Sequence, residues 1–150
     1  MSNIKLKNIF KTVCIASDHA GFDLKEDIKN YLINKKVSIF DLGPYSDHSV
    51  DYPDYAKKLS MRIKSKKSDA GILVCGSGTG MAISANKIRT IRAAVCYNLK
   101  STRLSRQHNN ANIIALGSRL TKKKLSLKLV EVFLKTKFEG GRHLRRVKKI

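Results

Sequence analysis

The chain has 150 residues, with 31 lysines and arginines against 11 aspartates and glutamates, a formal net charge of +20 at pH 7. This length is typical of one domain, and no apolar stretch approaches the roughly 20 residues that span a bilayer. The N-terminus lacks the apolar segment of a secretory signal, and three cysteines form neither a disulfide framework nor a zinc-ligand pattern. We therefore expect a reduced, cytoplasmic, single-domain protein.

Positive charge increases toward the C-terminus, because residues 119–150 carry 12 lysines and arginines against 2 acidic residues. Such a field attracts phosphorylated substrates and also binds nucleic acid loosely. The excess is mostly lysine, which is also typical of compositional drift on solvated surfaces. The charge therefore predicts an anionic ligand and leaves nucleic-acid binding as an alternative.

Short apolar runs alternate with helical patterns along the chain. Strands are expected at residues 12–17, 37–42, 71–74, 92–97 and 111–116. Helices are expected at residues 24–32, 55–63, from 81, 101–107 and 125–134, followed by a basic tail. Cys14 and Cys96 fall inside apolar runs and are expected in the core. The alternation predicts an α/β fold, a Rossmann-like doubly wound sheet of about five mainly parallel strands with helices on both faces.

The stretch after the third expected strand carries the most chemical information. Cys75 ends the strand, glycine follows at every second position (Gly76, Gly78, Gly80), and a helical pattern begins near Met81. A glycine loop before a helix exposes backbone N–H groups that bind anions, and a thiol there is favoured as thiolate. The spacing matches neither the dinucleotide-binding nor the P-loop motif. The loop is thus a phosphate cradle, a catalytic anion hole, or a tight turn beside a buried cysteine.

Polar residues also follow the first two expected strands. Asp18 and His19 come directly after the first, and a polar loop that includes Tyr52 comes after the second. Ligands of open parallel sheets collect beyond the carboxyl ends of the strands, so we expect these residues to meet Cys75. A helix N-cap is the alternative role for Asp18 and His19.

Two further groups do not follow from that rule. His108 and Asn109 end the fourth expected helix, where a histidine is also favoured by the helix dipole alone. Arg142 and Arg146 share one face if the tail is helical, which suits a phosphate clamp. The alternative for the tail is a solvated basic end.

Seven motifs together resemble one known family. They occupy residues 17–22, 50–56, 75–81, 85–87, 108–109, 115–119 and 138–143. In this order they resemble ribose-5-phosphate isomerase of type B, in the family that also contains galactose-6-phosphate and allose-6-phosphate isomerases. The resemblance covers residues 12–150, so residues 1–11 are expected to be an N-terminal extension, and residues 136–150 a basic tail that contributes to the site.

The resemblance implies an aldose–ketose isomerase of the pentose phosphate pathway. It would interconvert ribose 5-phosphate and ribulose 5-phosphate through an enediolate, without cofactor or metal. It would be a homodimer or tetramer whose sites combine residues of two subunits, with no membrane partner. The alternatives are a hexose-phosphate isomerase acting on allose or galactose 6-phosphate, and a basic nucleic-acid-binding protein on an isomerase fold.

The resemblance also implies roles for individual residues. Cys75 would be the base that moves a proton between C1 and C2, and Ser77 with the loop N–H groups would hold the enediolate oxygen. His108 would assist ring opening, and Asp18 would orient sugar hydroxyls. The substrate-binding residues would be His19, Tyr52, Gly76, Gly78, Thr79, Gly80, Asn109, Arg119, Arg142 and Arg146. Among these, His19 and the three arginines would bind phosphate.

One position divides the family. Members without the cysteine use a glutamate just after the glycine loop, where this chain has Met81, which cannot accept a proton. The chain therefore resembles the cysteine-base branch, and the loop is predicted to be an oxyanion hole rather than a nucleotide cradle. Two positions depart from the family: Ser77 replaces the usual threonine, and Asn110 replaces a common aspartate beside His108.

Overall fold

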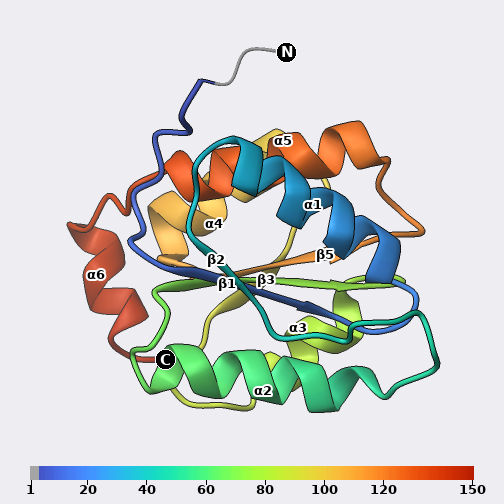
Figure 1. Cartoon of the computed structure of the whole chain (residues 1–150). Helices are drawn as coiled ribbons and strands as arrows, with labels where there is room; N and C mark the ends of the chain where they lie inside the picture. Colours follow the sequence, from blue (N-terminus) through green and yellow to red (C-terminus); the bar gives the residue numbers. More distant parts are fainter. Residues whose placement is uncertain (1–3) are drawn as a thin grey trace.

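Five parallel strands form one sheet in the order β2-β1-β3-β5-β4 (Figure 1). In this computed structural model, which describes residues 4–150, the strands are β1 Val13–Ser17, β2 Ile39–Asp41, β3 Ala70–Cys75, β4 Ala93–Val95 and β5 Ile113–Gly117. Each strand enters from the same edge because the intervening segments return the chain across the sheet. The predicted parallel α/β architecture is confirmed.

Helices cover both faces of the sheet (Figure 1). Those found in residues 4–150 are α1 Phe22–Asn34, α2 Tyr52–Lys64, α3 Thr79–Ala85, α4 Leu99–Asn109, α5 Lys123–Lys135 and α6 Arg142–Val147. One apolar core forms between the sheet and α1, α4 and α5, and a second forms between the sheet and α2 and α3. None of these helices is both long and apolar enough to cross a membrane.

The central strands are fully buried, whereas the edge strands are shorter than predicted. β1, β3 and β5 bury every residue, as parallel strands covered on both faces do. β2 and β4 have three residues each, where the apolar runs predicted six at residues 37–42 and 92–97. An edge strand has a partner on one side only, so its end residues stop forming strand-to-strand hydrogen bonds sooner than those of a central strand.

Both ends of the described chain pack against the sheet layers. Leu6 is buried, and its N–H donates to the Lys35 carbonyl; the Ile9 N–H donates to the Leu134 carbonyl. The first three residues of the expected extension lie outside the described residues. The C-terminal tail contains α6, so the helical condition placed on Arg142 and Arg146 is met.

The topology creates a crevice between β1 and β3. The chain leaves β1 for β2 on one side, whereas β5 and β4 extend the sheet beyond β3 on the other. Ligand sites of open α/β sheets lie at such a switch point, outside the carboxyl ends of the strands. Ser17 pairs with Val74, so the next residues along the two strands, Asp18 and Cys75, come out side by side.

Candidate active site

A cleft of about 540 Å³ opens at this switch point. It is lined by Asp18, Tyr52, Cys75, Gly76, Ser77, Thr79, Gly80, Ile83, Arg119 and Leu120. These residues come from the carboxyl ends of β1, β3 and β5 and from the first turns of α2 and α3. The structure thus brings together most of the residues that the sequence associates with Cys75.

Cys75 lies at the floor of the cleft with its sulfur beside a backbone donor. The residue is 4% exposed, and the Gly78 N–H donates a hydrogen bond to Sγ at 3.1 Å. Gly78 has φ +78°, a left-handed conformation that turns its N–H back toward the sulfur. A side chain there would also approach the Leu116 backbone to 3.0 Å. The aimed N–H dipole stabilises negative charge on the sulfur.

The other two cysteines are confirmed as core residues. Cys14 and Cys96 are fully buried, and all three cysteines of the chain are free thiols. Burial raises the pKa of Cys14 to about 11, and burial also raises the pKa of Cys96. Both therefore stay protonated at neutral pH. Cys75 is the cysteine that lines the cleft.

The connection after β5 holds the glycine loop in place. The Ser118 N–H donates to the Cys75 carbonyl at 2.8 Å, and the Arg119 N–H donates to the Gly76 carbonyl at 3.0 Å. The Arg119 guanidinium lies against Gly76, where an added Cβ would be 3.0 Å from Nη1. A cation therefore lies beside the loop. Within the loop, the Ser77 hydroxyl accepts a hydrogen bond from the Thr79 N–H.

The helix N-cap, the alternative role for Asp18 and His19, is wrong, because Gly21 is the N-cap of α1 and no side chain caps that helix. The Asp18 carboxylate accepts a 2.9 Å hydrogen bond from the Gly21 N–H, which shapes the turn into α1, and the residue also lines the cleft. His19 is exposed beside it but outside the cleft lining, with Nδ1 3.2 Å from the backbone N and O of Val50. Tyr52 lies over Gly80, where an added Cβ would be 2.8 Å from the ring.

A second group of predicted site residues lies elsewhere in the chain: His108, Asn109, Arg142 and Arg146. The segment after α4 joins the amino-terminal edge of the sheet, because Gly71, near the start of β3, donates its N–H to the Asn112 carbonyl. Cys75 ends the same six-residue strand, so the length of β3, roughly 15 to 20 Å, separates the two groups. Figure 1 shows α6 at one end of the sheet and the β1–α1 turn at the other.

The second group is organised around two stacked imidazoles. The His108 and His143 rings are nearly parallel, with 4.2 Å between centroids, and this contact joins α4 to α6. Burial lowers the pKa of His143, and the neighbouring His108 and Arg142 lower it further. Arg142 and Arg146 are exposed one helical turn apart, so both project from one side of α6.

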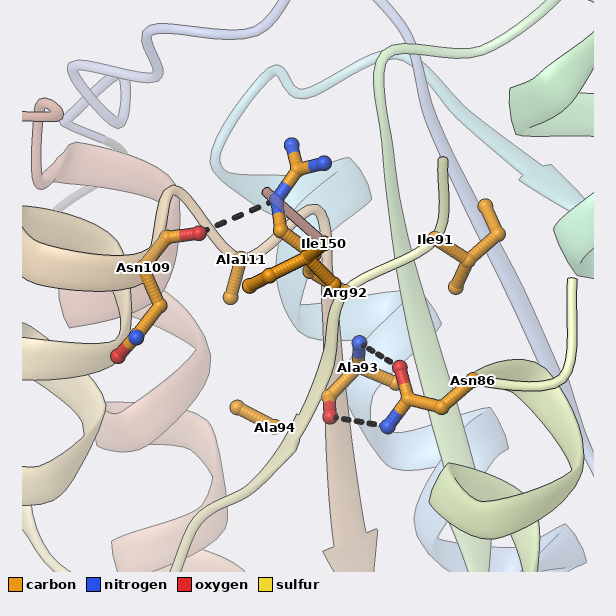
Figure 2. Close-up of a pocket in the computed structure, with 8 residues that line it drawn as sticks. All are labelled: Asn86, Ile91, Arg92, Ala93, Ala94, Asn109, Ala111 and Ile150. Atoms are coloured by element: carbon orange, nitrogen blue, oxygen red, sulfur yellow. Dashed lines mark hydrogen bonds between the residues drawn. The ribbon is translucent and has the colours of Figure 1, made fainter. Parts of the chain in front are cut away.

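Two arginines hold the turn that follows α4. Figure 2 shows the Arg92 guanidinium at the Asn109 carbonyl, to which Nε donates at 3.1 Å. Buried Arg106 donates to Asn110 Oδ1 at 2.9 Å and to the Thr136 carbonyl, and burial lowers its pKa to about 10. Asn110, which replaces the common aspartate of the family, thus gives Arg106 a neutral hydrogen-bond acceptor in place of a charged one. The hollow in Figure 2 is lined by no thiol, hydroxyl or imidazole, unlike the cleft at Cys75.

Several residues at these sites carried no usable sequence signal. Ile83 and Leu120 line the cleft with 58% and 60% of their surface exposed. Each is a single apolar residue beside a polar loop, so neither belongs to a periodic pattern. Exposed apolar side chains around a cleft are typical of surfaces that bind a partner or ligand. Glu139 and His143, which lie against His108, were likewise not predicted as site residues.

The fold and cleft define an α/β enzyme whose thiol lies beside a backbone anion site at a topological switch point. The model of the Ribose/Galactose Isomerase family matches residues 13–150, so the chain belongs to that family. It is 41% identical to ribose-5-phosphate isomerase B of Escherichia coli over 140 residues, which cover 93% of this chain and 94% of that protein.

Solved structures agree with this family membership. A ribose 5-phosphate isomerase from Thermotoga maritima is 54% identical, with a TM-score of 0.90 over 92% of this chain and 95% of that one. Ribose-5-phosphate isomerase B from Mycoplasma genitalium, solved with bound ribulose-5-phosphate, is 44% identical, with a TM-score of 0.87 over 92% of each chain.

Proposed function

We propose that this protein is a single-domain ribose-5-phosphate isomerase that interconverts ribose 5-phosphate and ribulose 5-phosphate in the pentose phosphate pathway. Family membership and the names of the relatives support this activity, and one relative was solved with ribulose-5-phosphate. The observation that carries the proposed chemistry is the Cys75 sulfur at the cleft floor, hydrogen-bonded to the Gly78 N–H. Three free cysteines suit a reducing cytoplasm.

The reaction requires one base and one anion hole. In the open-chain aldose, the Cys75 thiolate takes the proton from C2, the C–H electrons form the C1=C2 bond, and O1 becomes the enediolate oxygen. The hydroxyl proton then moves from O2 to O1, and return of the C–H proton from Cys75 to C1 lets the O2 electrons form the carbonyl at C2. Ser77 and the loop N–H groups would stabilise the oxygen anion, which is absent from the ground state. One such donor contributes roughly 3 to 4 kcal/mol in other enzymes.

The neighbouring helix supports a cysteine base. Met81 occupies the position at which part of the family has a glutamate, and it is fully buried in α3. A thioether cannot accept a proton at neutral pH. Asp18 is the carboxylate in the cleft lining, and it accepts a hydrogen bond from the Gly21 N–H. We therefore assign proton transfer to Cys75 and hydroxyl orientation to Asp18.

The complete site requires two subunits. Arg119 and His19 are at the Cys75 end of the sheet, whereas His108, Arg142 and Arg146 are at the other. A pentose phosphate is shorter than the strand that separates them, so both groups can reach one substrate only when they come from different chains. Exposed Ile83 and Leu120 beside the cleft provide apolar surface for such a contact. We infer a homodimer, alone or paired into a tetramer.

Cys75→Ala tests the proposed activity, with Cys14→Ala as a matched control. Cys14 lies on the adjacent strand, fully buried outside the cleft lining. We expect Cys75→Ala to lower kcat for ribose 5-phosphate about 10²- to 10⁴-fold, as loss of a general base does, and Cys14→Ala to keep its kcat. Circular dichroism checks that both variants fold. Equal turnover by Cys75→Ala and wild type, or wild-type turnover of allose 6-phosphate alone, would refute the proposal.

A further inference from the structure

Three side chains with metal-ligating atoms converge where α4, the tail and α6 meet. The ligating atoms of His108, Glu139 and His143 all lie within 4.8 Å of one another. Glu139 Oε2 is 4.0 Å from His108 Nε2 and 3.7 Å from His143 Nε2. Both distances exceed those of a hydrogen bond, so the carboxylate lies near both imidazoles without hydrogen bonding to either.

The backbone builds this arrangement. The Glu139 N–H donates to the Gln107 carbonyl, which places Glu139 against the last turn of α4. Gly140 and Gly141 then take φ values of +68° and +53°, which turn the chain back so that His143 in α6 approaches Glu139. The stacked rings hold both Nε2 atoms on the side of the carboxylate. The convergence is therefore a product of the fold rather than of mobile surface side chains alone.

We propose that His108, Glu139 and His143 form a binding site for Zn²⁺ or a similar transition-metal ion. Two histidines and one glutamate are an established zinc donor set, with a fourth position left for water. Tetrahedral zinc places its ligand atoms about 3.3 Å apart, so the two carboxylate-to-imidazole separations need to shorten by about 0.4 and 0.7 Å and the third, at most 4.8 Å, by up to about 1.5 Å. The two rings, which are nearly parallel, must also rotate so that both nitrogen lone pairs point at the ion. Side-chain rotation can supply this, because the side chains of His108 and Glu139 are 38% and 50% exposed.

The surrounding charge selects the kind of ion. Arg142 and Arg146 flank His143 on α6, so the neighbourhood is positively charged. Mg²⁺ and Ca²⁺ need several oxygen ligands, whereas this site offers one carboxylate and two imidazoles. Zn²⁺ and Cu²⁺ bind imidazole strongly enough to offset the repulsion. The site is therefore specific for imidazole-binding ions.

The ion would inhibit the enzyme, and this consequence rests on the proposed isomerase function. His108 would assist opening of the sugar ring by moving a proton at its imidazole. An imidazole nitrogen bound to a metal has no lone pair left to accept a proton. Occupation of the site would therefore stop the turnover of the cyclic substrate, without any contact between the ion and Cys75.

Cobalt absorption tests binding independently of activity. The untagged full-length protein is stripped with a chelator and titrated with Co²⁺, whose visible bands report its ligands. Wild type and Cys75→Ser should give the same bands without sulfur-to-cobalt charge transfer, and Glu139→Gln should bind at least about tenfold more weakly, because even losing an outer-shell partner costs about 10- to 100-fold. Absence of bands in wild type, equal binding by Glu139→Gln, or loss of bands in Cys75→Ser would overturn the site.

Zinc inhibition tests the consequence. We expect Zn²⁺ to inhibit wild-type turnover of ribose 5-phosphate, a chelator to reverse it, and Glu139→Gln to require at least about tenfold more zinc. Mg²⁺ at the same concentration should have no effect. Inhibition of Glu139→Gln at the wild-type zinc concentration would assign the effect to another site, Cys75 above all, and would refute this consequence. An inactive metal-free wild type would instead refute the isomerase proposal, whatever the cobalt spectra show.

Discussion

Cys75 and Cys14 illustrate how position within one sheet changes the surroundings of a thiol. Both are buried, on neighbouring strands of the same sheet. Cys14 is enclosed by the core, and this burial raises its pKa to about 11. Cys75 lies one residue before the glycine loop, where the Gly78 N–H points at its sulfur. The difference comes from the strand end and the left-handed glycine, not from the residue type.

Deuterium exchange should separate the roles of Cys75 and His108. The C5 oxygen of ribulose 5-phosphate carries the phosphate, so its C2 carbonyl cannot close a five-membered ring and needs no ring opening. In D₂O, His108→Ala should still incorporate deuterium at C1 of ribulose 5-phosphate while converting ribose 5-phosphate slowly. Cys75→Ala should lose both activities. NMR measures the exchange, and equal losses of C1 exchange in the two variants would contradict the assignment of ring opening to His108.

At the scale of elements, α6 gives the basic residues of the tail defined positions on a helix. Arg142 and Arg146 are one turn apart, whereas Arg145 projects about 100° from Arg146 and about 60° from Arg142, on the flank of that face. We expect Arg142→Ala with Arg146→Ala to raise KM for ribose 5-phosphate about tenfold or more, because each charge-assisted bond contributes about 1.5 to 3 kcal/mol. Arg145→Ala, the matched control, should leave KM within about twofold. A comparable rise of KM in Arg145→Ala would mean that overall charge, not a clamp, binds the phosphate.

The contact between α1 and α5 predicts an alkaline stability loss. Tyr31 donates its hydroxyl to Glu131, and burial with this carboxylate raises the pKa of Tyr31 to about 12. The bond therefore stabilises the fold fully below pH 10, where unfolded tyrosine is still protonated, and its contribution falls as pH rises through 12. Tyr31→Phe should lower the free energy of unfolding by about 1 kcal/mol at pH 7. The deficit should shrink between pH 10 and 12.

Urea denaturation at fixed pH measures this difference. Tyr97→Phe is the control, because the Tyr97 hydroxyl takes part in none of the hydrogen bonds identified within residues 4–150. Its unfolding free energy should stay within about 0.5 kcal/mol of wild type. If the loss of unfolding free energy in Tyr31→Phe is the same from pH 7 to 12, the hydrogen bond donated by the Tyr31 hydroxyl does not account for that loss.

The elements that sequence patterns predicted are those with a long buried face. Leu24, Ile28 and Leu32 repeat every fourth residue, and the helix they predicted is α1, buried through all three. α6 has six residues, four of them basic or histidine, so it has no apolar stripe from which a helix could be predicted. The edge strands were over-extended because an apolar run does not show where its partner strand ends.

The residues of the candidate site also differ in whether a sequence pattern could predict them. The rule for strand ends placed Asp18 beside Cys75 because it depends only on parallel topology. It says nothing of His108, which lies at a helix end near the opposite sheet edge. The approach of Glu139 and His143 to His108 depends on two consecutive positive φ angles, which glycine permits but does not require.

At the scale of the whole molecule, the two halves of the proposed site face away from each other. The Cys75 cleft and the His108 group are separated by the length of β3, and the positive charge of the tail belongs to the second group. A single chain therefore holds the proposed base, Cys75, far from the proposed phosphate clamp, Arg142 and Arg146. Pairing two chains would complete two sites at once, as a twofold dimer does.

Subunit complementation tests this account most directly. Cys75→Ala and His108→Ala chains carrying different tags are unfolded together, refolded as a mixture, and assayed with ribose 5-phosphate. Each mixed dimer would contain one site with Cys75 from one chain and His108 from the other, and one site with neither. Random pairing makes about half of the dimers mixed, so we predict about a quarter of wild-type activity. Mixed dimers, verified by their two tags, that are no more active than either variant alone would contradict a site shared between subunits.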